Sequence, residues 1–487
     1  MVFYPIVFFI LLFLLVRYSR VFHIEGLPNY YSSISFLTKV ISGIAFLSIY
    51  TLYYGQGTLS ADAEQFMRES KVLNDVFYQS PGDYFKFFFG FDNSEALINK
   101  YLSSTSHWSA GTQTILNDNR NILRVHSIIH FFSFNSVYIH ILVMSFISVF
   151  STNNIFLALK KYVSVSPKQL FWFLILLPSL TFWSASILKE PMMILGFSLI
   201  LRTLLYDDSR KKEVILFFVG LILLAGFKPY ILILSLIAVG FYFLYQSFSR
   251  YQLLFASSIY LVLFLATVFI FQNKATNFVQ LLSRKQFDFV NISKGGIHID
   301  TDTNFIFFSP QQYSSIEKTG DSIKIIKEVD AMILQHGSIK QPVPIHLKPS
   351  PENWKIYFER TYSEGYIETT PIDNSSIQLI KNIPEAVTNA LFRPVPFDPG
   401  GWLKHPAIIE TILLFGFLFY TIIKRKKLSR KEKAIIYSTC LFIFLLALLI
   451  GWVTPVLGAI VRYRIMAYLG ILGIALILYD PNKKRSA

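Results

Sequence analysis

The sequence predicts an all-α polytopic membrane protein with about 11 transmembrane helices and a mixed α/β insertion on its outer face. Three observations lead to this prediction. Of the 487 residues, 53% are hydrophobic and 17% are aromatic, and the mean hydropathy is positive. Apolar stretches long enough to cross a membrane recur to the end of the chain. Lys and Arg cluster in alternate gaps between those stretches.

The apolar stretches set the number of predicted spans. A hydrocarbon core of about 30 Å needs roughly 20 helical residues, or somewhat fewer when the helix ends carry snorkelling side chains. The first stretch is short and could lie partly in the interface, which leaves the count open by about one. The predicted spans are residues 2–18, 33–54, 136–158, 169–187, 190–206, 213–228, 230–248, 252–272, 405–423, 434–453 and 464–480.

The basic residues orient the chain. Under this threading every cluster falls on one side, which the positive-inside rule assigns to the cytoplasm, so the N-terminus is outside and the C-terminus inside. The net charge of +15 then reflects topology and contact with anionic inner-leaflet lipid, and it does not indicate nucleic acid. The clusters are Arg17/Arg20, Lys160/Lys161/Lys168, Arg210/Lys211/Lys212, Arg250, residues 424–433 and Lys483/Lys484/Arg485.

The chain divides into five segments under this threading. Because Arg17 follows the first apolar run and no basic residue precedes it, that run is expected to be a retained span and not a cleaved signal peptide. The lone Cys440 excludes an intramolecular disulfide framework. The segments are the first two transmembrane helices (1–54), a first outer loop (55–135), central transmembrane helices (136–272), an outer soluble insertion (273–404) and C-terminal transmembrane helices (405–487).

The two outer segments differ in character. In the first, residues 84–89 and 122–134 are amphipathic and rich in aromatic side chains, which is typical of helices lying at the membrane interface. In the second, alternating runs at 304–308 and 322–326 predict strands, and the prolines of 341–351 predict turns. No internal repeat is found, which disfavours the common repeat-built transporter folds.

The first acidic candidates are Asp62 and Glu64, at the start of the first outer loop. A transferase acting on a hydroxyl or amine needs a carboxylate within hydrogen-bond reach as general base. A loop just above the membrane would hold such a group beside a lipid-borne donor. The alternative is that both acids are solvated or cap a following helix.

Lys189 and Glu190 join two spans by a very short outer turn, beside Ser184 and Ser186. Charges near membrane depth tend to face a cavity or a partner, so Lys189 would bind a phosphate with the two serines as additional donors. The alternative is equally consistent with the sequence. In it Lys189 snorkels, and Glu190 and Pro191 occupy the favourable first turn of the next helix.

Three further sites place cations at the same predicted depth. Lys228 lies in a tight outer turn before Tyr230, and Arg393 precedes the span that begins near His405. Arg462 and Arg464 enter the last span. With Lys189 these cations suit a lipid phosphate or pyrophosphate, since Arg forms bidentate forks and Lys acts as a point charge.

Other motifs are expected to be structural. The Asp300-x-Asp302 pattern is expected to form a turn, because nucleotide sugars are not available on the outer side. His126, His130 and His140 lack the Glu of a metalloprotease helix, so no metal site is predicted there. No Gly-x-Ser-x-Gly elbow and no P-loop occurs, which disfavours a hydrolase of that type and ATP hydrolysis.

The pattern resembles the GT-C class of membrane glycosyltransferases. The acid that follows an early transmembrane helix and the Arg462-Tyr463-Arg464 entry to the last span carry this resemblance. Residues 178–190 and 227–230 also resemble bacterial surface-polysaccharide membrane proteins, including O-antigen and capsule polymerases. The resemblance implies that Asp62 is the catalytic base, Glu64 a second acid, and Arg462 and Arg464 neighbours of the donor phosphate. The chain departs from the class in its Asp-x-Glu spacing and its mid-chain insertion.

The expected function is transfer of a sugar from a polyprenyl phosphate at the outer face of the bacterial cytoplasmic (inner) membrane. Partners would be the lipid-linked sugar, membrane lipid and a glycan or lipid-linked acceptor, without nucleic acid. No cofactor is identified, and a divalent metal stays open. The alternative is a lipid-linked glycan transporter, or a non-catalytic component of a polysaccharide or secretion machine. The predicted supporting residues of the transferase site are Ser184, Ser186, Glu190 and Tyr230.

Overall fold

The chain forms two compact units, which are described separately. A computed structural model describes residues 3–92, 94–108, 117–206, 211–247, 254–255, 257–260, 262, 278–301, 303–335, 338, 340–372, 376–481 and 483. Unit 1 comprises Met1–Ile237, Phe417–Glu432 and Leu472–Ala487, and unit 2 comprises Ala238–Gly416 and Lys433–Ile471. Several long helices therefore contribute residues to both units.

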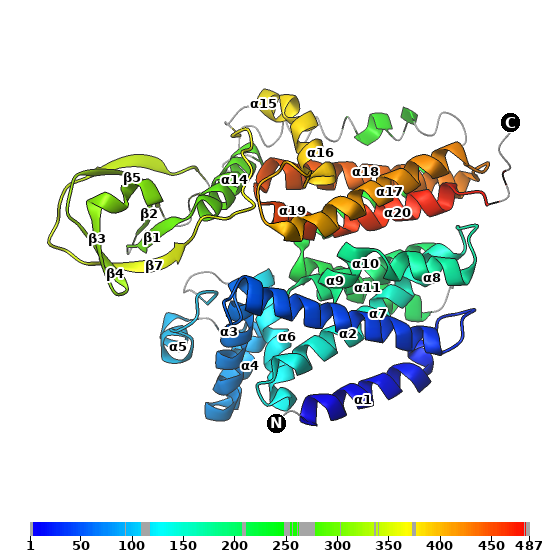
Figure 1. Cartoon of the computed structure of the whole chain (residues 1–487), viewed down its shortest axis with the longest axis horizontal. Helices are drawn as coiled ribbons and strands as arrows, with labels where there is room; N and C mark the ends of the chain where they lie inside the picture. Colours follow the sequence, from blue (N-terminus) through cyan, green and yellow to red (C-terminus); the bar gives the residue numbers. More distant parts are fainter. Residues whose placement is uncertain are drawn as a thin grey trace. The chain divides into compact units, whose positions relative to one another are not determined.

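Both units are mostly helical, as the sequence predicts (Figure 1). In the first half of the chain the helices are α1 (Phe3–Tyr18), α2 (Tyr30–Ser48), α3 (Ala61–Gln79), α4 (Pro81–Phe89), α5 (Glu95–Tyr101), α6 (Asp118–Ser133), α7 (Val137–Lys160), α8 (Pro167–Ile175), α9 (Pro178–Ser184), α10 (Glu190–Leu205), α11 (Lys211–Phe227) and α12 (Pro229–Ser247). In the second half they are α14 (Phe278–Lys294), α15 (Ser376–Lys381), α16 (Ile383–Phe392), α17 (His405–Ile423), α18 (Arg430–Val453), α19 (Leu457–Tyr463) and α20 (Ile465–Leu478).

Several long apolar helices indicate a multi-pass membrane protein. Among the described residues, five helical segments are long and apolar enough to cross a membrane, and a sixth results if the bent pair α19–α20 is one span. The eleven predicted spans are thus not shown. The five segments are Tyr30–Tyr53, Val137–Lys160, Pro229–Ser247, Trp402–Ile423 and Arg430–Val453.

Prolines and short helices account for much of the difference from the predicted spans. The predicted span 169–187 is broken, since α8 ends at Ile175 and α9 begins at Pro178. Proline lacks an amide hydrogen and fits the first turn of a helix, so it starts a new helix and does not continue the old one. Helices α10 and α11 have 16 and 17 residues. Most of the predicted span 252–272 lies outside the described residues.

Apolar side chains on the candidate spans face outward where lipid would lie. On α17, Ile412, Leu413 and Phe419 are each about two-thirds exposed, at 65%, 66% and 67%. Such a continuous exposed apolar surface is unusual for a soluble protein and is expected for a helix in lipid. The opposite face of α17 buries Thr411 and Leu414.

Close packing of helices in unit 1 depends on small residues. Gly196 of α10 and Gly220 of α11 face one another, and a Cβ added to Gly220 would lie 2.8 Å from the Gly196 carbonyl oxygen. Only glycine permits this approach of two backbones, an arrangement common between membrane helices. Helix α7 packs against α2, α6 and α10, so it forms the centre of the unit.

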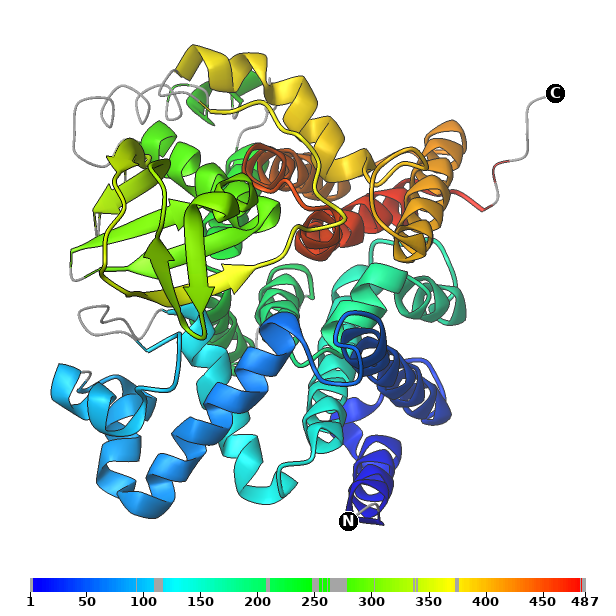
Figure 2. The ribbon, with the colours of Figure 1, turned by 60° about the vertical axis from the view of Figure 1, so that its left-hand side comes forward.

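The insertion in unit 2 contains an antiparallel sheet (Figure 2). Its seven strands follow the order β3-β4-β7-β1-β2-β5-β6. They are β1 (Gly296–Asp300), β2 (Asn304–Phe308), β3 (Ile316–Thr319), β4 (Ser322–Ile325), β5 (Val329–Gln335), β6 (Val343–Leu347) and β7 (Trp354–Arg360). The predicted strands at 304–308 and 322–326 are therefore confirmed as β2 and β4.

Alternation along these strands builds the sheet core. Side chains of a strand point to opposite faces in turn. The buried residues accordingly recur at every second position: Ile297 and Ile299, Ile306 and Phe308, Ile323 and Ile325, and Val329 and Ala331. Asp300 ends β1, and the Thr301 amide donates to the Asn304 carbonyl in the β1–β2 hairpin turn. Asp302 lies outside the described residues.

The contact between α16 and α18 generates a prediction for unit 2. A Cβ added to Gly451 would lie 1.9 Å from the Ala386 carbonyl oxygen, whereas one added to the helical Gly416 would have no neighbour within 4 Å. We expect Gly451→Ala to destabilise the protein by about 1–3 kcal/mol or more, because backbone must move. Gly416→Ala should be neutral or stabilise by up to about 1 kcal/mol. Thermal unfolding of the detergent-purified variants measures both effects, and equal melting temperatures would contradict this packing.

Candidate functional site

Unit 1 contains a cluster of four charged side chains that we call the charged cluster: Asp118, Lys189, Glu190 and Lys228. The Lys189 Nζ lies 2.6 Å from Asp118 Oδ2, and the Lys228 Nζ lies 3.8 Å from Glu190 Oε1. Glu190 and Lys228 are 1% and 5% exposed, and Lys189 is 9% exposed. The structure thus brings three sequence-predicted residues together around one acid that sequence reasoning missed.

Helix ends place these four groups. Asp118 is the first residue of α6, where the Asn117 side chain caps the helix by accepting from the Arg120 amide at 3.1 Å. Glu190 and Pro191 begin α10, directly after Lys189. Both carboxylates therefore occupy first turns, where the helix dipole stabilises negative charge. Lys228 lies between α11 and α12.

Asn121 fixes the distance between α6 and the turn that carries Lys228. Its Nδ2 donates to the Gly226 carbonyl at 2.8 Å, and its Oδ1 accepts from Arg124 Nη1 at 2.5 Å. The two contacts also orient the amide, since the carbonyl can only accept and the guanidinium can only donate. Asn121 therefore links α6, which carries Asp118, to the turn that carries Lys228.

The charged cluster is neutral when its four groups are ionised. Partial burial raises the pKa of Asp118, but the neighbouring Lys189, and then Lys228, outweigh that effect and hold this pKa below its usual range. Asp118 is consequently a carboxylate near neutral pH.

The two acids of α3 have different environments. Glu64 forms an exposed i,i+4 ion pair with Arg68 at 2.8 Å, an arrangement that contributes only tenths of a kcal/mol. Asp62 lies half-buried in the first turn. Phe66, one turn further on the same face, has the Lys189 Nζ 5.8 Å from its ring centroid. The face of α3 that carries Asp62 therefore adjoins the charged cluster.

The predicted supporting residues contact neighbouring helices and the turn before Lys189. Ser184 Oγ accepts hydrogen bonds from Lys39 Nζ at 2.7 Å and from Ser148 at 2.6 Å. Ser186 donates to the Trp183 carbonyl at 2.8 Å and accepts from the Leu188 amide at 3.3 Å, so it closes the turn before Lys189. The ring of Tyr230 lies 5.7 Å from Lys228 Nζ. These contacts position the turn rather than supply free donors.

Histidines form a hydrogen-bond chain that ends at the same turn. His126 Nε2 lies 2.9 Å from the Ile187 carbonyl, His126 Nδ1 lies 2.9 Å from His140 Nδ1, and His140 Nε2 lies 3.2 Å from Ser133 Oγ. Because a carbonyl only accepts, His126 donates from Nε2 and accepts at Nδ1. His140 must then donate from Nδ1 and accept from Ser133. His126 thereby holds the carbonyl two residues before Lys189.

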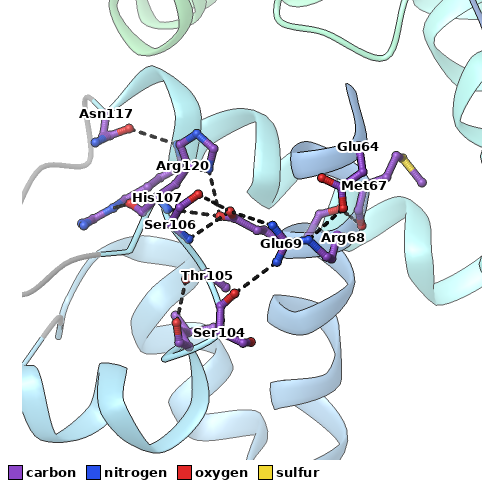
Figure 3. Close-up of polar contacts among 12 residues, drawn as sticks. Glu64, Met67, Arg68, Glu69, Ser104, Thr105, Ser106, His107, Asn117 and Arg120 are labelled. Atoms are coloured by element: carbon purple, nitrogen blue, oxygen red, sulfur yellow. Dashed lines mark hydrogen bonds and ion pairs between the residues drawn. The ribbon is translucent and has the colours of Figure 1, made fainter. Parts of the chain in front are cut away.

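Figure 3 shows a second polar network, between α3 and residues 104–107. The fully buried Glu69 accepts from the Ser106 amide and hydroxyl at 3.0 and 2.7 Å. It also accepts from the His107 amide and Nδ1 at 3.2 and 2.9 Å. Burial alone would raise the pKa of Glu69, but hydrogen bonds from His107 and then Ser106 lower it overall. Glu69 is therefore a buried carboxylate.

The segment that Glu69 holds also contacts two buried arginines of α6. Arg120 Nε donates to the His107 carbonyl at 2.9 Å. The Arg120 and Arg124 guanidinium groups lie 4.7 and 5.4 Å from the Trp108 ring centroid. Arg124 also donates to the Phe87 carbonyl, and burial, followed by the charge of Arg120, lowers the pKa of Arg124 to about 10. The aromatic ring and the carbonyls offset part of the burial of positive charge.

The remaining predicted cations, Arg393, Arg462 and Arg464, belong to unit 2. Arg464 is fully buried and donates to the carbonyls of Ala390 and Leu391, both at 3.4 Å, and of Arg393. It thereby satisfies the last carbonyls of α16, which is a stabilising position for a cation. Arg393 pairs with Asp398 at 3.4 Å, and Arg462 lies over the Tyr463 ring at 5.1 Å. Each of the three guanidinium groups has its own partners.

Sequence reasoning missed Asp118, Glu69 and His107. Asp118 follows Asn117 at a helix start, and an Asn-Asp pair before an amphipathic run signals such a start. Glu69 lies seven residues after Asp62, so both occupy one face of α3. No local pattern pairs Glu69 with His107, which is 38 residues away.

Neither comparison with known proteins nor the search for metal-binding geometry assigns a function to the site. No protein-family model, curated protein or solved structure matches the chain. In the part of the chain that the structure describes, no group of three or more His, Cys, Asp or Glu side chains has the geometry to hold a metal ion. The candidate site is therefore defined by the geometry of the charged cluster and the adjoining face of α3.

The histidines of α6 generate a pH prediction. Burial is the main cause that lowers the pKa of both His126 and His130 to about 4. Between about pH 6.5 and 4 the unfolded chain binds protons that the folded chain does not, so stability must fall as the pH falls through this window. The loss reaches at most about 3 kcal/mol per histidine.

Melting temperatures of the detergent-purified protein between pH 7.5 and 4.5 measure this loss. His298 in unit 2 also has a pKa of about 4, caused mainly by burial, and contributes the same sign. His130 Nε2 lies 3.1 Å from Ser70 Oγ, and the amide of Gln takes the place of Nε2 in this contact. The informative quantity is therefore the difference in slope between the wild type and His130→Gln. An unchanged slope would contradict a neutral buried His130.

Proposed function

We propose that this chain is a glycosyltransferase that uses a polyprenyl-phosphate-linked sugar at the outer face of the bacterial cytoplasmic membrane. One observation carries the proposal: α6, the turn before α10 and the α11–α12 turn bring two buried lysines and two acids together beside the face of α3 that carries Asp62. Buried charges of this kind are costly and concentrate at functional sites. The distribution of Lys and Arg supports the outer side.

In the proposed reaction, an acceptor hydroxyl attacks the anomeric carbon of the donor sugar. A bond forms between the acceptor oxygen and that carbon, and the bond from the carbon to the phosphate oxygen breaks with its electron pair. Asp62 takes the hydroxyl proton. Lys189 and Lys228 neutralise the charge that develops on the leaving lipid phosphate, which preorganised cations do effectively in a water-poor site. Asp118 and Glu190 hold both lysines in place before the ligand arrives.

Asp62→Asn tests the base. We expect this variant to accumulate and melt like the wild type but to transfer sugar about 100-fold more slowly or worse, since general bases contribute about 10²–10⁴-fold. The measurement is transfer in proteoliposomes from a panel of polyprenyl-phosphate- and polyprenyl-diphosphate-linked sugars, together with the glycan content of cells. Glu64→Gln is the matched control, because its surface ion pair with Arg68 predicts near-wild-type activity. Unchanged glycan output in the Asp62 variant would exclude Asp62 as the general base.

The phosphate contact is tested by a charge-neutral double variant, Lys189→Gln with Asp118→Asn. Removing both partners leaves no unpaired charge, so the fold should persist. We expect a 10- to 100-fold weaker affinity for a short-chain polyprenyl phosphate in nanodiscs, since a hydrogen bond to a charged group contributes about 1.5–3 kcal/mol. Lys86→Gln with Asp83→Asn removes a comparable pair on α4 and is the control. Equal affinities in the two double variants would rule out the contact.

A transporter of lipid-linked glycans is the second candidate, favoured by Lys39. This lysine is fully buried within a candidate span and donates to Ser184. Charges inside a span often mark a transport path. Under this alternative the Asp62 variant would keep its full function in cells, and Lys39→Met would abolish movement of the lipid-linked sugar across the membrane. The enzyme hypothesis predicts the opposite ranking of the two variants.

A further inference from the structure

The hydrogen bonds of Glu69 hold the loop at residues 104–107 and also fix the tautomer of His107. A carboxylate can only accept hydrogen bonds, and both oxygens of Glu69 accept them, from Ser106 and from His107. The 2.9 Å contact from His107 Nδ1 to Glu69 Oε2 therefore requires the ring hydrogen on Nδ1. In the neutral ring the lone pair then lies on Nε2. A buried carboxylate thus selects the tautomer that makes Nε2 a proton acceptor.

The His107 side chain is partly accessible: it is 16% exposed, whereas Glu69 is fully buried. Within the described residues, the contacts of His107 use its amide, its carbonyl and Nδ1, and no hydrogen bond to Nε2 is found. The charged groups that face the pair are Arg68, whose Nη2 lies 3.8 Å from Glu69, and Arg120, whose Nε donates to the His107 carbonyl. Neither occupies Nε2.

Phe66 connects this pair to the charged cluster. The His107 ring centroid lies 5.7 Å from that of Phe66, and Lys189 Nζ lies 5.8 Å from the same ring centroid. Phe66 is 2% exposed, so these neighbours surround it closely. A histidine with an open nitrogen and a phosphate-binding lysine therefore contact one aromatic side chain.

We infer that His107, oriented by Glu69, is a general base of the charged cluster and accepts the proton of the acceptor hydroxyl. This inference rests on the proposed function for its substrate, and it replaces Asp62 by His107 as the acceptor of that proton, so the transfer rates of Asp62→Asn and His107→Asn decide between the two residues. The hydroxyl proton goes to Nε2 while the oxygen forms its bond to the anomeric carbon. Glu69 stabilises the imidazolium that results and keeps its own charge. The arrangement is that of a carboxylate-backed histidine, found on many unrelated folds.

The first experiment needs no sugar substrate. Diethyl pyrocarbonate modifies accessible unprotonated imidazole nitrogen, and peptide mass spectrometry locates the product. In the native full-length protein we expect modification of His107 but not of the fully buried His126 and His140. Glu69→Gln should slow the reaction of His107 several-fold, because an amide can donate to Nδ1 and no longer dictates the tautomer. An unreactive His107 in the folded protein would overturn the inference even if transfer is observed.

The second experiment separates catalysis from fastening. His107→Asn keeps a donor near the Nδ1 position and so keeps the contact with Glu69, but it removes Nε2. We expect its melting temperature to stay close to wild type while kcat falls about 100-fold or more with little change in KM. Normal kcat in this variant would show that His107 only fastens the loop. If the wild type transfers no sugar from any tested donor, the proposed function fails, whereas the chemical reactivity of Nε2 is still decided by the first experiment.

Discussion

The compensation of buried charge is the constraint on which unit 1 depends. Moving an ion out of water costs several kcal/mol unless a partner and hydrogen bonds replace its hydration. Lys189, Lys228 and Glu190 are all buried, and each lysine has a carboxylate partner: Asp118 of α6 for Lys189, and Glu190 for Lys228. Helix starts, tight turns and a bridging amide therefore follow from one requirement. The same requirement explains why Glu69 has four hydrogen bonds and why Lys39 is held by Ser184.

Unit 2 satisfies this constraint differently. The hydrogen bonds of the buried Arg464 go to main-chain carbonyls at the C-terminal end of α16 and to Thr411 Oγ1. Tyr468 lies beneath the guanidinium at 4.2 Å and also donates to the Leu391 carbonyl at 2.9 Å. An arginine in such a position stabilises a helix end, whereas Lys189 and Lys228 of unit 1 pair with carboxylates. The contrast is the reason that the proposed chemistry uses the cluster of unit 1.

Composition and periodicity predicted the helical membrane class and the strands at β2 and β4. The sequence also singled out Lys189, Lys228 and Glu190, which the structure brings close together. The number of spans was not predictable in the same way, because hydropathy does not register that Pro178 starts a new helix or that α10 is short. Asp118 and His107 were beyond sequence reasoning for another reason. Their significance comes from partners 71 and 38 residues away, and only tertiary packing creates those pairs.

Helix α6 gives unit 1 a mechanical property. Its first residue binds Lys189, its next turn holds the Gly226 carbonyl through Asn121, and its third holds the Ile187 carbonyl through His126. Through Arg120 it also grips the loop that carries His107. One helix thus connects all four of these contacts. In the reaction proposed above, the lysine beside the leaving phosphate and the loop that carries His107 would therefore be held by the same helix.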